Sequence, residues 1–154
     1  MCGIVGGITN RDITPLLIEG LKRLEYRGYD SSGIALLTKN NTFKRARSVG
    51  KVENLEKNLT TRKNKIKGNI GIAHTRWATH GEPSEKNAHP HISNNTISVV
   101  HNGIIENYLE LKDSQLKQGY SFTSDTDTEV IAHAIEFAMQ SNDSFVKSVQ
   151  KAIT

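Results

Sequence analysis

Cysteine is almost absent from this sequence, which holds one cysteine, one tryptophan and three prolines among 154 residues. A single cysteine excludes an internal disulfide, so the composition favours a reducing compartment. No apolar run approaches the roughly 20 residues that cross a bilayer, and Arg11 and Asp12 interrupt the opening apolar run where a secretory signal would continue. The sequence therefore predicts a cytoplasmic protein without membrane contact, long enough for one domain.

The net charge of +4 is unevenly distributed along the chain. Residues 39–67 hold ten lysines and arginines against two glutamates, so this segment carries +8 and the remainder −4. A nucleic-acid-binding module is one interpretation of such a segment. Phe43 is its one aromatic residue that could stack on a base, so we favour a solvated surface and expect no nucleic-acid partner.

Hydrophobic periodicity predicts strands followed by helices. Strands are expected over residues 3–9, 34–38, 42–49, 69–75 and 97–100, the first two of them buried. Helices are expected from Thr14, over residues 107–119, from Thr126 and from near Ser144, while residues 54–65 fit either a helix or a loop. This order predicts a layered domain of the α+β or mixed α/β class.

Helix starts are marked by residues that can cap a free backbone amide. Thr14 followed by Pro15 predicts an N-cap and a first helical position. The apolar face of that helix is expected to be Ile13, Leu16, Leu17, Leu21 and Leu24. Thr126 and Glu129 have the spacing of a capping box. That box would put Asp127 in the first helical turn, where the macrodipole favours a carboxylate.

Cys2 follows only the initiator methionine and precedes a short apolar strand. Removal of Met1, which is expected before a residue as small as cysteine, would leave Cys2 with a thiol and a free α-amine. This places a nucleophile and a base on one residue. An α-amine titrates near ~7.7–8.0 and a thiol near ~8.5, so the amine can accept the thiol proton near neutral pH. A cysteine at position 2 is weak evidence on its own.

Polar and turn-forming residues gather where the predicted strands end, which is where scaffolds present functional groups. They occupy residues 27–32, 74–82, 101–103 and 124–127. Taken singly, Asn102-Gly103 indicates an ordinary tight turn with positive φ, and Arg76 a structural salt bridge. The spacing His89-x-His91 invites a metal hypothesis, but residues 87–91 are predicted to form a loop and not a helix face, so we expect no metal.

Five motifs occur in order, namely Cys-Gly-Ile-Val-Gly at 2–6, Tyr-Arg-Gly-Tyr-Asp-Ser-Ser-Gly at 26–33, His-Thr-Arg-Trp-Ala-Thr-His-Gly at 74–81, His-Asn-Gly at 101–103 and Thr-Asp-Thr-Glu at 126–129. Together they resemble the glutaminase domains of the glucosamine-6-phosphate synthase family, which are type 2 glutamine amidotransferases and N-terminal-nucleophile hydrolases. The resemblance runs from residue 2 to about residue 137 and is closer than that to amidophosphoribosyltransferases. It implies a four-layer αββα sandwich of the α+β class, incomplete at its carboxy-terminal end.

The resemblance implies a role for each motif. Cys2 would attack the side-chain amide of L-glutamine, hold a γ-glutamyl thioester and release ammonia, with its own α-amine as base. The side-chain NH₂ of Asn102 and the backbone N–H of Gly103 would form the oxyanion hole. Arg76 would bind the α-carboxylate of glutamine, and Asp127 its α-ammonium group. Further contacts to glutamine or the nucleophile would come from Trp77, Thr79, His80 and Gly103, with Arg27 as a positioning or gating residue.

The resemblance also implies a larger context. Residues 2–154 would be the amino-terminal portion of a glutaminase domain, with the sugar isomerase domain absent from this chain. The full-length enzyme would be a homodimer without cofactors that passes ammonia internally to fructose 6-phosphate and forms glucosamine 6-phosphate for amino sugar biosynthesis. Coupling the two sites keeps ammonia from water. Two alternatives stay open, a basic nucleic-acid-binding module and a catalytically inactive fragment that only binds glutamine.

Overall fold

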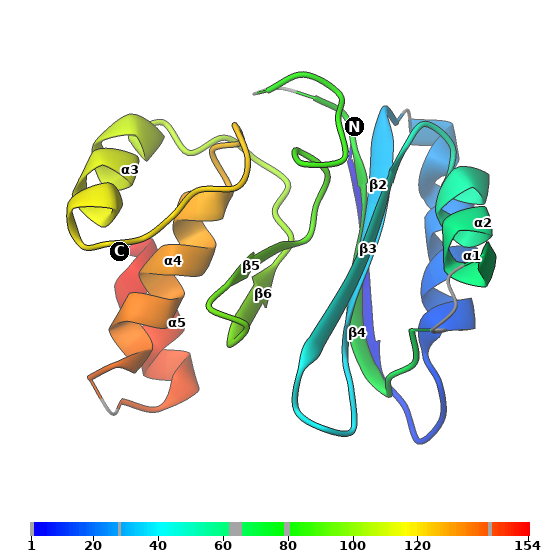
Figure 1. Cartoon of the computed structure of the whole chain (residues 1–154), viewed down its shortest axis with the longest axis horizontal. Coiled ribbons are helices and arrows are strands. Elements are labelled where there is room, and N and C mark those ends of the chain that lie inside the picture. The colour runs from blue at the N-terminus through cyan, green and yellow to red at the C-terminus, as the bar shows by residue number, and fades with distance from the viewer. Residues whose placement is uncertain (1, 28, 62–65, 79–80, 142) are drawn as a thin grey trace.

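An antiparallel sheet with helices on one face forms the amino-terminal part of the chain (Figure 1). The computed structural model describes residues 2–27, 29–61, 66–78, 81–141 and 143–154. The strands lie in the order β1 (Gly3–Ile8), β4 (Ile70–Arg76), β2 (Ser31–Leu37) and β3 (Phe43–Val49). The covering helices are α1 (Thr14–Leu24), which ends in the 3-10 turn η1 (Glu25–Arg27), and α2 (Val52–Thr61).

A second, shorter sheet and its helices form the carboxy-terminal part. Its strands are β5 (His91–Ser93) and β6 (Ile97–Val99). Its helices are α3 (Tyr108–Lys117), α4 (Glu129–Met139) and α5 (Phe145–Ile153). Helix α4 contacts both strands and packs against α3 and α5. In Figure 1 the β5–β6 sheet stands between the larger sheet and α4, so the layers follow the order helix, sheet, sheet, helix. The predicted αββα layering of the α+β class is therefore confirmed.

Each sheet buries an apolar core against its helices. The larger core consists of Ile13, Leu17, Ile18, Leu21, Ile34, Leu36, Ala46, Val52, Leu55, Leu59 and Ala73. The smaller core consists of Ile97, Ala132 and Ile135, with Val99, Ile131, Met139, Val149 and Ala152 packed against it. Among the helices of the described chain, none is long and apolar enough to cross a membrane.

Helix α1 differs in detail from its prediction. Its N-cap is Ile13, and the amide of Thr14 donates to a carboxylate oxygen of Asp12 at 3.2 Å. Ile18 is buried, whereas Leu16 is 48% exposed. The predicted Thr14 cap and the placing of Leu16 in the apolar face are therefore wrong. Adjacent helical positions point about 100° apart, so a face centred on residues 17, 18 and 21 leaves residue 16 about 150° from that centre, on the solvent side.

Strand β1 is half exposed, although a buried strand was expected over residues 3–9. Ile4 is 43% and Ile8 is 76% exposed, because alternate side chains of β1 point away from α1. Strand β2 begins at Ser31, three residues earlier than expected. Residues 54–65 were ambiguous in the sequence, and helix α2 accounts for those up to Thr61.

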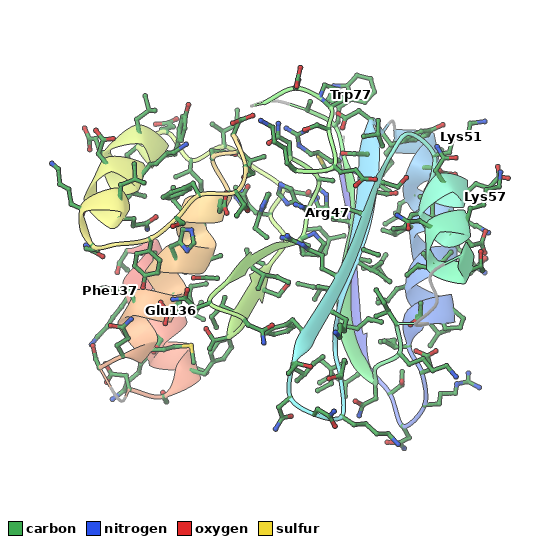
Figure 2. All side chains as sticks on the ribbon, viewed as in Figure 1. Arg47, Lys51, Lys57, Trp77, Glu136 and Phe137 are labelled. Carbon is green, nitrogen blue, oxygen red and sulfur yellow. The ribbon has the colours of Figure 1, made fainter. Side chains whose placement is uncertain are left out.

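Two arginines of the basic segment 39–67 are partly buried rather than solvated. Arg45 donates to the carbonyl of Pro90 at 3.1 Å, and Arg47 donates to that of Ala88, also at 3.1 Å. Burial lowers the pKa of Arg47 to about 10. Arg47 lies on the side of the sheet away from α2 (Figure 2). The expectation of a solvated face is wrong for these two residues, because β3 turns them towards the loop before β5.

Candidate active site

Alternation along β1 and β4 puts reactive side chains on the sheet face opposite α1. A Cβ on Gly3 would lie 2.8 Å from the Leu24 side chain, so Gly3 faces the helices. Because successive side chains of a strand point to opposite faces, Cys2 lies on the other side. His74 and Arg76 of β4 share that side, since β4 pairs with β1 in antiparallel register. Strand pleating alone thus brings these three side chains to one face.

The thiol of Cys2 is held against the end of β4. The backbone amide of Trp77 donates to the Cys2 sulfur at 3.1 Å, and the thiol donates to the Trp77 carbonyl at 3.7 Å. The next residue, Gly3, donates its amide to the Thr75 hydroxyl at 3.0 Å, which fixes the start of β1.

Asn102 approaches Cys2 from the loop that follows β6. Its Nδ2 donates to the backbone carbonyl of Cys2 at 3.2 Å, and its Oδ1 lies 2.7 Å from Nε2 of His74. A Cβ on Gly103 would lie 2.7 Å from Nε2 of His101. A side chain at this position would therefore force the His101 ring to move. The predicted positive-φ turn at Asn102-Gly103 is wrong, because neither residue has a positive φ.

Arg76 is 4% exposed. Its guanidinium donates to the carbonyls of Gly81 at 3.0 Å and Glu82 at 3.5 Å. It also lies 3.8 Å from a carboxylate oxygen of Asp30. Asp30 donates its amide to the Arg76 carbonyl at 2.7 Å and accepts from the amide of Ala78. Asp30 therefore fixes both the arginine and the chain that leaves β4.

Asp127 is 4% exposed and lies just before α4. Its Oδ2 accepts from the amide of Ile105 at 2.7 Å, and its Oδ1 accepts from the Thr128 hydroxyl at 3.5 Å. Thr128 is the N-cap of α4, so Asp127 precedes the helix and is not in its first turn. The expected helical position of Asp127 is therefore wrong, although the residue remains close to the helix amino terminus.

The predicted capping box of α4 is also wrong, because tertiary contacts occupy both of its side chains. Glu129 accepts from the amide and hydroxyl of Ser124 at 2.8 and 2.7 Å and from the Thr123 hydroxyl at 2.8 Å. Burial acts to raise the pKa of Glu129, but these hydrogen bonds outweigh it and leave that pKa below its usual value. The Thr126 hydroxyl lies 3.0 Å from Nε2 of His91.

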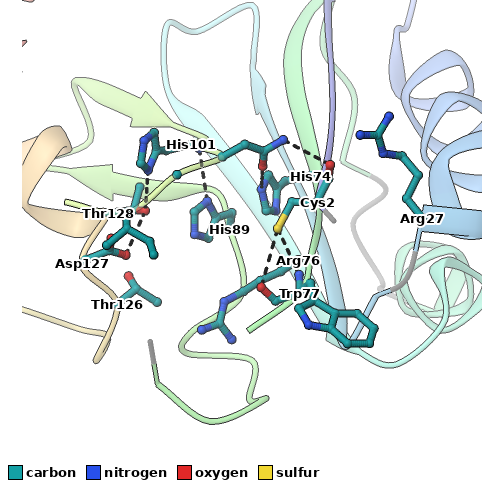
Figure 3. A pocket seen from close by; sticks show the side chains of 13 residues that line it. Cys2, Arg27, His74, Arg76, Trp77, His89, His101, Thr126, Asp127 and Thr128 are labelled. Carbon is teal, nitrogen blue, oxygen red and sulfur yellow. Dashed lines mark hydrogen bonds between the residues drawn. The ribbon is translucent and has the colours of Figure 1, made fainter. Parts of the chain in front are cut away.

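A pocket of about 390 Å³ collects the predicted side chains (Figure 3). The predicted residues that line it are Cys2, Arg27, Arg76, Trp77, Asn102, Gly103 and Asp127. Its other lining residues are His74, His89, His101, Ile104, Thr126 and Thr128. In Figure 3 Arg27 lies on the opposite side of Cys2 from Asp127. Thr79 and His80, which were also predicted to contact glutamine, lie outside the described residues.

Three buried histidines pack together, and two of them, His74 and His89, line the pocket. The rings of His74 and His89 stack with centroids 4.3 Å apart, and the His91 ring meets His89 edge-on at 4.6 Å. Burial lowers the pKa of His74 to about 4 and holds the pKa values of His89 and His91 well below that of a free imidazole. All three rings are therefore neutral at pH 7. The His89-x-His91 pair packs ring against ring.

Sequence reasoning gave no role to His74, His89 or Asp30, each of which contacts a predicted site residue or its loop. The i, i+2 spacing from His74 to Arg76, at the end of the strand predicted over residues 69–75, was an available signal, because it places both side chains on one face if the strand continues to Arg76. Asp30 belongs to the motif at 26–33, but nothing in its spacing pointed to β4. The stacking of His89 on His74 depends on a loop path that no local pattern encodes.

Comparison with known proteins agrees with this geometry. A family model described as a glutamine amidotransferase domain matches residues 74–150, half of the 154-residue chain. The chain is 55% identical over 152 residues to the glutamine–fructose-6-phosphate aminotransferase [isomerizing] of Legionella pneumophila, covering 99% of this chain and 25% of that protein. It is 57% identical over 153 residues to the protein of the same name from Acinetobacter baylyi, covering 99% and 24%. The chain spans about a quarter of the length of these curated relatives.

Solved structures show the same fold. A glutamine phosphoribosylpyrophosphate amidotransferase from B. subtilis, complexed with ADP and GMP, superposes with a TM-score of 0.75 at 26% identity, covering 99% of this chain and 32% of that one. An allosteric regulatory enzyme of purine biosynthesis superposes with a TM-score of 0.74 at 27% identity, with the same coverage. The family suggested by the five sequence motifs is therefore confirmed, and the chain belongs to the glutamine amidotransferase domain family.

Proposed function

We propose that this chain hydrolyses L-glutamine to glutamate and ammonia, as the ammonia-supplying part of an enzyme that converts fructose 6-phosphate to glucosamine 6-phosphate. The observation that carries the first half is one pocket shared by Cys2, Arg76, Asn102 and Asp127. The second half is supported by relatives whose name is glutamine–fructose-6-phosphate aminotransferase [isomerizing].

In the proposed reaction, the free α-amine of Cys2 takes the thiol proton and the thiolate attacks the side-chain amide carbon of glutamine. The carbonyl π bond opens and its oxygen becomes an oxyanion, which accepts hydrogen bonds from Nδ2 of Asn102 and the N–H of Gly103. Collapse of this intermediate breaks the C–N bond. The Cys2 ammonium group returns its proton to the leaving nitrogen, so ammonia departs and a thioester remains.

Water completes the proposed cycle. The α-amine of Cys2 takes a proton from the water molecule as its oxygen attacks the thioester carbon, and a second oxyanion forms at the same donors. The C–S bond then breaks, glutamate leaves, and the proton held by the amine restores the thiol. One residue therefore serves as nucleophile, base and acid, which keeps every proton transfer short.

The two ends of the glutamine backbone would be recognised by opposite charges. The Arg76 guanidinium would bind the α-carboxylate, because its planar fork matches a carboxylate. The Asp127 carboxylate would accept hydrogen bonds from the α-ammonium group. Both side chains are 4% exposed, so their charges are screened little by solvent. Trp77, Thr79 and His80 would complete the glutamine site, and Arg27 would position or gate the nucleophile.

The larger context is proposed from the relatives. Residues 2–154 would form the amino-terminal portion of a glutaminase domain, and a sugar isomerase domain outside this chain would bind fructose 6-phosphate. We place the enzyme in the cytoplasm as a homodimer. A nucleic-acid-binding role for residues 39–67 is not favoured, because Arg45 and Arg47 donate to loop carbonyls inside the protein.

Removing the carboxylate of Asp127 from the protein, and separately the α-amino group from the substrate, tests whether these two groups bind each other. In the full-length protein with Met1 removed, we expect Asp127→Asn to raise the KM for glutamine at least tenfold, about 1.4 kcal/mol. The same variant should leave the KM unchanged for glutaramate, the analogue that lacks the α-amino group. An equal effect on both substrates, or none on glutamine, would refute the role of Asp127. Absence of glutamate release from the processed wild-type protein would favour the alternative in which glutamine is bound but not hydrolysed.

A further inference from the structure

Asn102 has contacts at both ends of its side-chain amide (Figure 3). Oδ1 lies 2.7 Å from Nε2 of His74, and Nδ2 donates to the backbone carbonyl of Cys2 at 3.2 Å. The two ends of a carboxamide have nearly the same shape but opposite hydrogen-bonding character. Which end faces the nucleophile therefore depends on the partners of Asn102.

The partners at both ends of the amide determine this choice. If the amide were reversed, Oδ1 would face the Cys2 carbonyl, and two acceptors would meet without a proton between them. In the observed orientation Oδ1 needs a donor from His74. A neutral imidazole carries one N–H, so the proton must be on Nε2. Nδ1 of His74 is buried without a hydrogen-bond partner of good geometry, although the backbone of His101 also acts to raise the pKa of this ring.

The surroundings hold the His74 ring in place. His74 is fully buried, and its ring stacks on that of His89 with 16° between the planes. Nδ1 of His89 accepts from the amide of His101 at 3.4 Å, next to Asn102 in the chain. Burial lowers the pKa of His74 to about 4, so the ring stays neutral at pH 7. The donor that faces Asn102 is therefore rigid and keeps one protonation state.

We propose that His74 is a positioning residue whose Nε2–H fixes the Asn102 side-chain amide with its NH₂ group towards the reaction centre at Cys2. This inference rests on the proposed function, since it gives a reason why Asn102 presents a donor to the oxyanion. His74 itself transfers no proton and binds no substrate. Without His74, the side-chain amide of Asn102 can rotate. In some molecules Oδ1 of Asn102 then faces the oxyanion in place of the NH₂ group, and these molecules are unreactive.

Two substitutions at one position separate this role from packing. His74→Phe keeps a flat ring against His89 and removes the donor, whereas His74→Gln places an NH₂ group near the position of Nε2. In the full-length protein, we expect His74→Phe to lower kcat for glutamine about 10- to 100-fold, less than the ~10²–10³ for loss of an oxyanion donor. KM should change less than twofold, and His74→Gln should recover at least tenfold of the lost kcat.

His133→Phe is the matched control, because His133 is also buried and neutral but lies on α4 outside the pocket, with Nδ1 2.8 Å from the Ser93 hydroxyl. We expect its kcat to equal that of the wild type, measured where both proteins remain folded by circular dichroism. Wild-type kcat in His74→Phe would overturn the proposal. Equal losses in His74→Phe and His74→Gln would also overturn it, because they would indicate packing alone.

A spectroscopic measurement tests the tautomer independently of activity. In protein labelled with ¹⁵N-histidine at pH 7, we expect His74 to show a protonated Nε2 and an unprotonated Nδ1. The opposite tautomer would overturn the positioning role whatever the glutaminase activity. If the proposed function were wrong, glutamine turnover would persist in a protein without Cys2. The ¹⁵N spectrum of His74 would be unchanged in that case, so the two failures can be told apart.

Discussion

The backbone amide of Trp77 lies 3.1 Å from the sulfur of Cys2, a contact between residues 75 positions apart in the chain. It ties the start of β1 to the segment that leaves β4. Since β1 and β4 are paired strands, the hydrogen bonds of the sheet maintain this contact. The position of the nucleophile thus depends on residues that never touch substrate, and their substitution should affect the site.

Asp30 is the first such residue. Its carboxylate accepts from the Ala78 amide and lies 3.8 Å from the Arg76 guanidinium. We expect Asp30→Asn to raise the KM for glutamine about tenfold, about 1.4 kcal/mol, because the arginine proposed to bind the α-carboxylate loses a charged partner. Steady-state glutamate release measures this. Asp143→Asn, which loses an exposed pair with Lys151, should leave KM unchanged, and equal effects of both substitutions would contradict the account.

Gly33 connects the two layers of the protein. A Cβ at this position would lie 2.1 Å from the carbonyl oxygen of His89, so Gly33→Ala must push the loop before β5 away from β2. We expect the free energy of unfolding to fall by about 2 kcal/mol or more, as for overpacked cores. Urea unfolding followed by circular dichroism measures it.

Gly6→Ala in β1 is the control for Gly33→Ala. Its Cβ would lie 3.5 Å from the nearest atom, a methyl carbon of Ile72, which is an ordinary contact. We expect its free energy of unfolding to stay within about 0.5 kcal/mol of the wild type. A loss in Gly33→Ala no larger than that in Gly6→Ala would show that the layers do not meet at Gly33.

The buried histidines predict a pH dependence of stability. His74 has a pKa lowered to about 4 by burial, whereas the unfolded chain binds this proton near ~6.5. Between these values the unfolded state holds more protons, so the free energy of unfolding falls as the pH is lowered. Each such histidine contributes a slope of up to ~1.4 kcal/mol per pH unit.

Urea unfolding at pH 7, 6 and 5 measures this slope. We expect His74→Phe to reduce it, because one titrating group is removed, while the wild-type protein keeps the slope from all its buried histidines. The same slope in both proteins would mean that His74 takes up its proton equally well in the folded and unfolded states.

Much of the site could be predicted from the sequence. Cys2, Arg76, Asn102 and Asp127 were assigned because short motifs resemble those of a known family, and the structure brings all four to one pocket. These motifs indicate where the pocket lies because each is at the end of a strand or beside the start of a helix. The pleating and pairing of the strands then restrict the directions in which the side chains of the motifs can point.

Other features depend on tertiary contacts that no local pattern reveals. The capping box at Thr126 and Glu129 has the right spacing, but His91 and Ser124 take up its side chains. Arg47 belongs to a charged run, yet it donates to a loop carbonyl across the sheet. The contact of His74 with Asn102 joins β4 to the loop after β6, and only the folded chain shows it.

Glutamine turnover by the Cys2→Ala variant of the full-length protein tests the central claim most directly. The account predicts that glutamate release is abolished while glutamine still binds, because the pocket residues other than the thiol stay in place. Binding can be followed by the change in Trp77 fluorescence, since this side chain lines the pocket. Turnover near the wild-type rate in Cys2→Ala would contradict the account, because the attacking atom would then lie elsewhere.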